Sequence, residues 1–110
     1  MKQKDIYLAN LDPAFGREQA GERPVVIISG DTMNSNMDIV IACPMTTSLK
    51  GYYGCVLVLA GPDSGLVSDS EILTFQPRAI SKKRLKKKIG SISSGQLAET
   101  LSNLVKICTY

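Results

Sequence analysis

The chain has 110 residues, 44% of them hydrophobic and 21% charged, and a net charge of +3, a composition that predicts one globular domain over residues 1–110. No apolar run approaches the ~18 residues of a membrane span, and the charged first residues lack the apolar core of a signal peptide, so we expect a cytoplasmic protein with no membrane partner. The chain has no histidine, and its three cysteines lack C-x-x-C spacing, so we expect core thiols, no metal and no cofactor.

The first half of the chain carries three runs typical of β-strands. Residues 6–11, 25–29 and 39–43 are rich in apolar and β-branched side chains. Segment 30–36, between the last two runs, has the composition of a loop.

The second half continues the β pattern and ends in a helix. Further strands are predicted at 55–60, 70–75, 78–81 and 87–92, with a turn signal at 61–65. Ser93 and Gln96 have the spacing of a helix capping box. After them an apolar stripe with helical spacing should pack on the sheet or on a second subunit; it consists of Leu97, Leu101, Leu104, Val105 and Cys108. The whole pattern predicts a small β-barrel or sandwich with a C-terminal helix.

Segment 82–88 concentrates the positive charge. It holds six of the thirteen basic residues, which leaves seven basic residues against ten acids in the rest of the chain. Such a run suits either nucleic acid phosphates or a solvated surface, and the composition leaves both interpretations open.

The strand order predicts that two distant polar residues are neighbours. If strands 25–29 and 39–43 form an antiparallel hairpin, Arg23 lies beside Thr46, because antiparallel partners keep a constant register. Pro24 and Pro44 fall at the same end, where a ladder can stop without losing an interior hydrogen bond. Loop 12–22 and segment 45–51 should therefore meet at one rim.

The side chains expected at this rim suit a phosphodiester. Arginine offers a planar fork of donors to phosphate oxygens, hydroxyls add donors, and tyrosines stack on unpaired bases. In RNA the 2′-hydroxyl can be the nucleophile, so the protein needs to supply only proton transfer and charge stabilisation. The rim residues are Glu18, Gln19, Glu22, Arg23, Thr46, Thr47, Ser48 and Lys50, with Tyr52 and Tyr53 close behind.

Each of these residues also has a purely structural interpretation. An arginine near two glutamates at the end of a loop is more often a surface ion pair, worth about 0–1 kcal/mol, than a catalyst. Hydroxyls in segment 46–48 can satisfy loop backbone groups, and both tyrosines can be ordinary strand residues.

Taken in order, these motifs resemble the MazF/PemK (Kid) toxins of bacterial toxin–antitoxin systems, and the resemblance covers nearly the whole chain. The segments that carry it are D-I-Y-L-A-N-L-D-P at 5–13, G-x-E-Q-x-G-x-R-P at 16–24, P-M-T-T at 44–47 with K-G at 50–51, D-S at 69–70 and Q-P-R-A-I at 76–80.

The resemblance implies an SH3-like β-barrel with a C-terminal helix, a homodimer, and a sequence-specific, metal-independent endoribonuclease. Such an enzyme cleaves single-stranded RNA, most often mRNA, to 2′,3′-cyclic phosphate and 5′-hydroxyl ends. The catalytic arginine and threonine of the family fall on Arg23 and Thr46. Because an arginine pKa above ~12 leaves little neutral guanidine, Glu18 is the better general base.

Further residues are expected to bind RNA, and a second protein to inhibit the toxin. The RNA-binding candidates are Gln19, Thr47, Lys50, Gln76 and Arg78. A cognate antitoxin should insert an acidic segment across the rim and compete with RNA. Two alternatives remain: a noncatalytic barrel toxin that poisons gyrase, as CcdB does, or a degenerate relative that binds RNA without cutting it.

Overall fold

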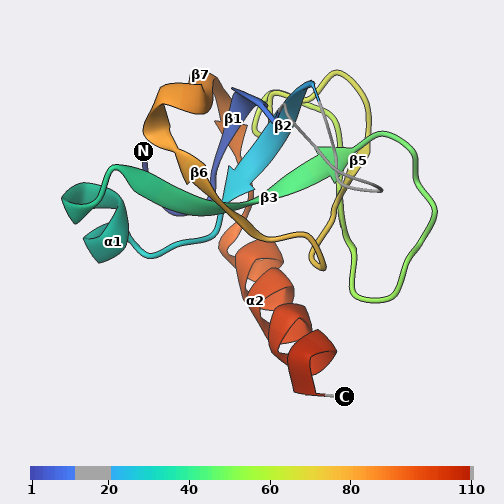
Figure 1. Ribbon diagram of the computed structural model, residues 1–110. Helices are drawn as coiled ribbons and strands as arrows, with labels where there is room; N and C mark the ends of the chain where they lie inside the picture. The colour runs from blue at the N-terminus through green and yellow to red at the C-terminus, as the bar shows by residue number, and fades with distance from the viewer. Residues whose placement is uncertain (12–20, 110) are drawn as a thin grey trace.

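The computed structural model describes residues 1–11 and 21–109, and Figure 1 shows their arrangement. The fold is mainly β, a curled half-barrel sheet with a C-terminal helix, as predicted. Neither helix in these residues is long and apolar enough to cross a membrane. The elements are β1 (Asp5–Asn10), β2 (Glu22–Ile27), α1 (Asp31–Asn36), β3 (Ile39–Thr46), β4 (Val56–Val58), β5 (Ser70–Ile72), β6 (Arg78–Ser81), the 3₁₀ turn η1 (Lys82–Arg84), β7 (Leu85–Ser91) and α2 (Ser94–Thr109).

The sheet is antiparallel, in the order β4-β5-β3-β2-β1-β7, and β6 pairs with β3 beside this path. Strand β3 is central because it changes partner along its length. Residues 39–42 pair with β6, and Met45 and Thr46 pair with β5. The end of β3 therefore brings β2 and β5 together at one edge of the molecule.

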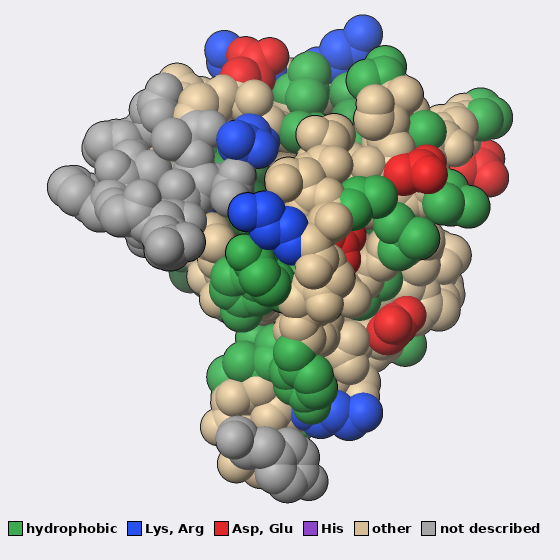
Figure 2. Space-filling model, turned by 90° about the vertical axis from the view of Figure 1, so that its right-hand side faces the viewer, with side chains coloured by type: hydrophobic (Ala, Val, Ile, Leu, Met, Phe, Trp, Pro, Cys, Tyr) green, Lys and Arg blue, Asp and Glu red, His purple; other side chains and the backbone are tan. Residues whose placement is uncertain are grey.

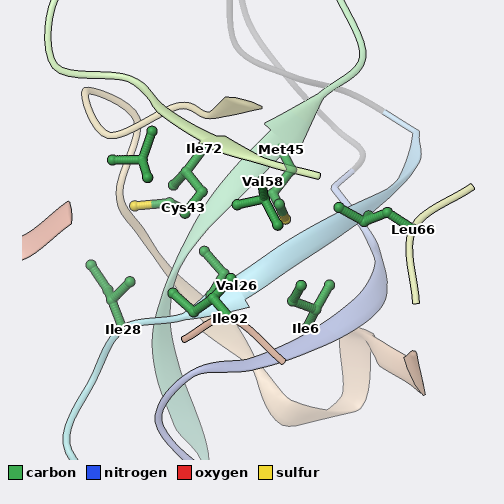
Figure 3. Packing of buried hydrophobic residues seen from close by; sticks show 10 residues of the cluster. Ile6, Val26, Ile28, Cys43, Met45, Val58, Leu66, Ile72 and Ile92 are labelled. Carbon is green, nitrogen blue, oxygen red and sulfur yellow. The ribbon is translucent and has the colours of Figure 1, made fainter. Parts of the chain in front are cut away.

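Alternation along the strands divides the core between the two faces of the sheet. In β2, Val25 and Ile27 point to one face, and Val26 points to the other. The face on the side of α2 carries a helix-side cluster of Ile6, Val26, Ile28, Cys43, Met45, Val56, Val58, Leu66, Ile72 and Ile92 (Figure 3). The opposite face carries a far-side cluster of Ala9, Leu11, Val25, Ile27, Val40, Ala42, Ile80 and Leu85.

The predicted hairpin register is the observed one. Val25 lies opposite Pro44 in the β2–β3 ladder, and the same register continued by two residues places Arg23 opposite Thr46. The β2–β3 ladder stops at the prolines, as expected, but the strands themselves continue. Pro24 still pairs with Leu8 of β1, and the strand end beyond Pro44 pairs with β5.

The prediction of a loop at 30–36 is wrong, because residues 31–36 form helix α1. No side chain caps its N-terminus. Instead, the helix is held by buried local hydrogen bonds, in which the Ser29 hydroxyl donates to the Asn34 side-chain carbonyl and the Asn34 amide donates to the Ser29 carbonyl at 2.8 Å. Lys82 also donates to the backbone carbonyl of Asn34. These contacts override the weak helix propensity of the segment.

The other strand boundaries differ from the predictions by a few residues. The predicted strands at 55–60 and 70–75 are shortened to the three-residue β4 and β5, because only those residues find ladder partners. The last strand begins two residues early, at Leu85, where it pairs with β1.

The capping box of α2 is confirmed. The Ser93 backbone N–H donates to Gln96 Oε1 at 2.9 Å, and the Gln96 N–H donates to Ser93 Oγ at 3.0 Å. Leu97 and Leu104 pack on the helix-side cluster, whereas Leu101 and Val105 of the predicted stripe stay exposed. The helix projects from the sheet, with its C-terminus farthest from the strands (Figure 1).

Candidate active site

A cavity of about 580 Å³ opens where β2, β3 and the chain after β5 meet. Its volume lies within the ~300–1,000 Å³ typical of small-ligand sites. On the face shown in Figure 2, Lys and Arg side chains lie next to hydrophobic ones. The cavity is lined by Arg23, Thr46, Ser48, Lys50, Tyr52, Leu73, Phe75 and Gln76.

Strand periodicity brings Arg23 and Thr46 to the same face of the sheet. Arg23 lies two residues before Val25, and Thr46 lies four residues after Ala42; both reference side chains belong to the far-side cluster. Arg23 and Thr46 are each half-buried at the end of the β2–β3 ladder. The two side chains therefore stand on adjacent strands at the open end of a packed core, which gives them a rigid base.

The Thr46 hydroxyl is oriented by its own loop. Its oxygen accepts a hydrogen bond from the backbone N–H of Ser48 at 3.1 Å. Because a hydroxyl also carries one donor, the Thr46 proton can be offered to a ligand oxygen in the cavity.

A buried carboxylate holds the segment after β3. Glu71, 8% exposed, lies opposite Thr46 in the β3–β5 ladder. Its Oε1 accepts the backbone N–H groups of Lys50 at 2.8 Å and of Gly51 at 3.2 Å. Gly51 has φ +61°, a conformation that glycine adopts without strain. Glu71 thus fixes the turn that carries Lys50 to the cavity.

Two aromatic side chains in contact with each other line the cavity. Tyr52 and Phe75 meet edge to face, with ring centroids 5.8 Å apart and planes at 76°. Their side chains are 48% and 40% exposed, so neither ring is an ordinary core residue. Leu73, which is buried, also lines the cavity, so the lining combines these apolar side chains with polar groups of β2 and β3.

Residues 2–108 match the family described as PemK-like, MazF-like toxins of type II toxin–antitoxin systems. The chain belongs to this family. It is 38% identical over 100 residues to the endoribonuclease MazF of Staphylococcus epidermidis, an alignment that covers 90% of this chain and 83% of the relative.

Solved structures agree with this assignment. The toxin resembles MazF from Deinococcus radiodurans with a TM-score of 0.83 and 26% identity, over 99% of this chain and 96% of that one. It also shares its fold with the MazF-mt6 toxin of Mycobacterium tuberculosis, with a TM-score of 0.78 and 22% identity, over 94% of each chain.

The toxin brings four of the catalytic and RNA-binding candidates to the cavity wall: Arg23, Thr46, Lys50 and Gln76. Ser48 and Tyr52, expected at the same rim, also line the cavity. Thr47 is exposed next to Thr46 but does not line the cavity. Arg78 lies on β6 opposite Ala42 and is not among the residues that line the cavity. Glu18 and Gln19 lie outside the described residues.

Two lining residues, Leu73 and Phe75, were absent from the predicted site. The sequence placed both in a strand over 70–75, where a side chain is expected to pack on the sheet. Strand β5 ends at Ile72 instead, and the turn that follows exposes Phe75. The only signal for this exposure is the position of Phe75 directly before Gln76-Pro77, a turn-like dipeptide.

Two lysines of the basic segment 82–88 form ion pairs with acidic side chains. Lys86 pairs with Glu22 at 2.9 Å, and Lys88 pairs with Asp5 at 3.2 Å. Glu22 therefore points to the basic run and away from the cavity. The Lys86 and Glu22 side chains are each about half exposed to solvent, so this ion pair adds little to the stability of the fold.

The three thiols have different environments. Burial raises the pKa of the Cys43 thiol to about 12. Burial, and then the carboxylate of Glu71, raise the pKa of Cys55, which is half-buried. Cys108 is exposed on α2, so the prediction of a core thiol is wrong there. Within residues 1–11 and 21–109, no three His, Cys, Asp or Glu side chains form a cluster able to hold a metal ion.

Proposed function

We propose that this toxin is a sequence-specific, metal-independent endoribonuclease that cleaves single-stranded RNA, with mRNA as its main target. The observation that carries the proposal is the meeting of Arg23 and Thr46 on adjacent strands in one cavity. The 38% identity to an endoribonuclease supports it. We place the reaction in the cytoplasm, where mRNA is found.

Arg23 and Thr46 bind the scissile phosphate in this proposal. The guanidinium holds two phosphate oxygens in its planar fork and stabilises the extra charge of the phosphorane. The Thr46 hydroxyl donates to one of these two non-bridging oxygens and helps to orient the phosphate for attack. Its own oxygen accepts the Ser48 N–H, which fixes the direction of the hydroxyl. Lys50 adds a point charge at the cavity wall.

The nucleophile comes from the substrate. The ribose 2′ oxygen forms a bond to phosphorus, and its proton passes to a general base, for which Glu18 is the candidate. The bond from phosphorus to the 5′ oxygen breaks, and that oxygen takes up a proton. The products are a 2′,3′-cyclic phosphate and a 5′-hydroxyl. Gln19, Thr47, Gln76 and Arg78 bind the flanking RNA.

The toxin works as a homodimer and is neutralised by a cognate antitoxin. A Deinococcus radiodurans MazF was solved with MazE, and a mycobacterial endoribonuclease was solved with its cognate antitoxin. By analogy, we expect an acidic segment of the antitoxin of this chain to compete with RNA for Arg23 and Lys50.

The test is RNA cleavage in excess EDTA, with mapping of the cut ends and their termini. Wild type should give discrete cuts with 2′,3′-cyclic phosphates. Arg23→Ala and Thr46→Ala should each lose about 10²- to 10³-fold in rate, as expected when one preorganised donor is removed. Thr32→Ala, exposed on α1 at the opposite side of the molecule from the turn after β3 (Figure 1), is the matched control and should cut normally.

Intact RNA from a folded wild-type dimer would contradict the proposal. Binding without cleavage would then identify a degenerate relative. Binding to gyrase, with no affinity for RNA, would identify a noncatalytic barrel toxin.

A further inference from the structure

The lining of the cavity combines two chemically different kinds of side chain. Arg23 and Lys50 supply positive charge, and Tyr52, Phe75 and Leu73 supply an apolar surface, here called the apolar wall. A nucleotide has the same division, because an anionic phosphate is joined to a base with apolar faces. Phosphate binding alone does not account for the apolar wall.

The ring geometry leaves room for a third planar group. An edge-to-face contact covers only one of the four faces of two rings, and Tyr52 and Phe75 are each about half exposed. With their planes at 76°, the rings form a corner. A base that stacks on one ring meets the second ring with its edge, so the corner fixes its position in two directions.

We propose that Tyr52 and Phe75 form a stacking subsite for one unpaired RNA base next to the phosphate held by Arg23 and Thr46. This subsite rests on the proposed function and names the part of the substrate that the apolar wall recognises. Stacking is tolerant of base identity, since every base has a π-face. The aromatic corner therefore supplies affinity and excludes paired RNA, whose bases are stacked on each other, and any choice between bases falls to neighbouring polar groups.

The subsite also explains how the turn after β3 matters for binding. Tyr52 follows Lys50 and Gly51, whose backbone N–H groups are held by Glu71. One short turn thus delivers both a cation for the phosphate and a ring for the base. The spacing between the two is fixed before RNA arrives, which lowers the entropy lost on binding.

The test uses an RNA analogue that cannot be cut. Mixed-sequence 2′-O-methyl RNA of ten nucleotides lacks the nucleophile, and an abasic sugar-phosphate oligomer of the same length serves as a phosphate-only probe. Tyr52→Ala and Phe75→Ala should each bind the 2′-O-methyl RNA about tenfold more weakly, within the range of one lost base–aromatic stack. Affinity for the abasic oligomer should not change.

Matched variants separate stacking from other effects. Tyr53→Ala removes a ring that is 73% exposed and does not line the cavity, and it should bind like wild type. Tyr52→Phe keeps the ring and should keep the affinity. Phe75→Leu keeps an apolar side chain of similar reach but has no π-face, and it should bind the 2′-O-methyl RNA more weakly than wild type. Circular dichroism melts confirm that each variant is folded.

Several outcomes would overturn the subsite: unchanged affinity in both alanine variants, an equal loss for the abasic oligomer, or a change in oligomeric mass without a change in RNA affinity. The last outcome would assign the rings to a protein contact. A wild type that binds the analogue through both rings but leaves ordinary RNA intact would refute the proposed cleavage and retain the subsite. A wild type that binds neither oligomer would refute both.

Discussion

At the scale of single residues, the clearest division of roles lies within Thr46. Its oxygen has a structural role, as the acceptor of the Ser48 N–H. In our proposal, its proton is donated to the scissile phosphate. The hydroxyl supplies both an acceptor and a donor from one atom, whereas valine, which has the same branched shape, supplies neither. Shape alone is therefore not sufficient at this position.

Two substitutions of Thr46 separate shape from hydroxyl chemistry. Thr46→Val keeps the branched shape and removes the hydroxyl, so we expect cleavage to fall by about 10²-fold or more. Thr46→Ser keeps the hydroxyl and should retain most of the activity. Single-turnover cleavage of one RNA measures both. Equal activity in the valine and serine variants would refute a donor role.

The thiols give a pH-dependent prediction. Thiolate is the reactive form, and a pKa of about 12 leaves about one Cys43 thiol in 10⁴ ionised at pH 8. Iodoacetamide at pH 8 should label Cys108 and spare Cys43, whereas denaturant should expose all three cysteines. Peptide mass spectrometry reads the sites, and rapid labelling of Cys43 in the native protein would contradict its burial.

The same shift affects stability at alkaline pH. The folded-state pKa of Cys43 lies above its ordinary value of 9.0, so the neutral thiol is favoured by folding. Its contribution is fully present below about pH 9 and is lost as pH rises toward 12. Denaturant titrations of wild type and Cys43→Ala over this range should converge as pH increases.

At the scale of elements, strand β5 acts on the site through one side chain. Glu71 is buried, lies opposite Thr46, and accepts two N–H groups from the turn that follows β3. Its negative charge does not favour phosphate nearby. Glu71 therefore acts by holding the turn after β3 in place, which makes it a positioning residue.

Glu71→Gln and Glu71→Leu test this positioning role. Glutamine keeps an acceptor oxygen and should retain most of the activity, whereas leucine leaves two N–H groups unpaired and lets the turn move. Because a displacement of 1 Å can cost about 10²-fold, we expect a loss of that size in kcat for Glu71→Leu, with the fold preserved.

Amide hydrogen exchange supplies a readout independent of cleavage. The N–H groups of Lys50 and Gly51 should be protected in wild type and in Glu71→Gln, and should exchange rapidly in Glu71→Leu. Thr32→Ala again serves as a control with unchanged protection. Slow exchange in Glu71→Leu would show that the turn is held by other contacts.

At the scale of the whole molecule, the sequence predicts the parts of the fold that depend on local pattern. The β-branched runs predict the strands, and a single hairpin register brings Arg23 to Thr46. What it misses depends on distant contacts. Helix α1 is held in part by Lys82, 48 residues along the chain, which donates to the Asn34 carbonyl, and the exposure of Phe75 requires β5 to end at Ile72. Neither can be read from local composition.

The candidate site follows the same rule. Arg23, Thr46 and Lys50 are predictable because the hairpin register brings their segments to one rim, and Gln76 is predictable from the resemblance to the family. Glu71 is not predictable in its observed role, since a carboxylate in a predicted strand is expected at the surface. Only the β3–β5 register shows that it faces the turn.

The two flanks of α2 give the last prediction, which concerns the proposed homodimer. Helical spacing places Leu101, Val105 and Cys108 on one exposed flank, and Glu99, Ser102 and Lys106 on another. Figure 2 shows hydrophobic side chains on the projecting helix. An exposed apolar flank beside the helix-side cluster is typical of a surface that is covered in an oligomer.

We therefore expect the apolar flank to be buried between two copies. Wild type should sediment with the mass of two 11.9 kDa chains, and Val105→Asp should shift it toward one chain, because an unpaired carboxylate is costly in an apolar interface. Ser102→Asp adds the same charge to the polar flank and should leave the dimer intact. If Val105→Asp remains dimeric, another surface joins the copies. A monomeric wild type would refute the homodimer itself, and RNA cleavage by that monomer would show that one chain carries a complete site.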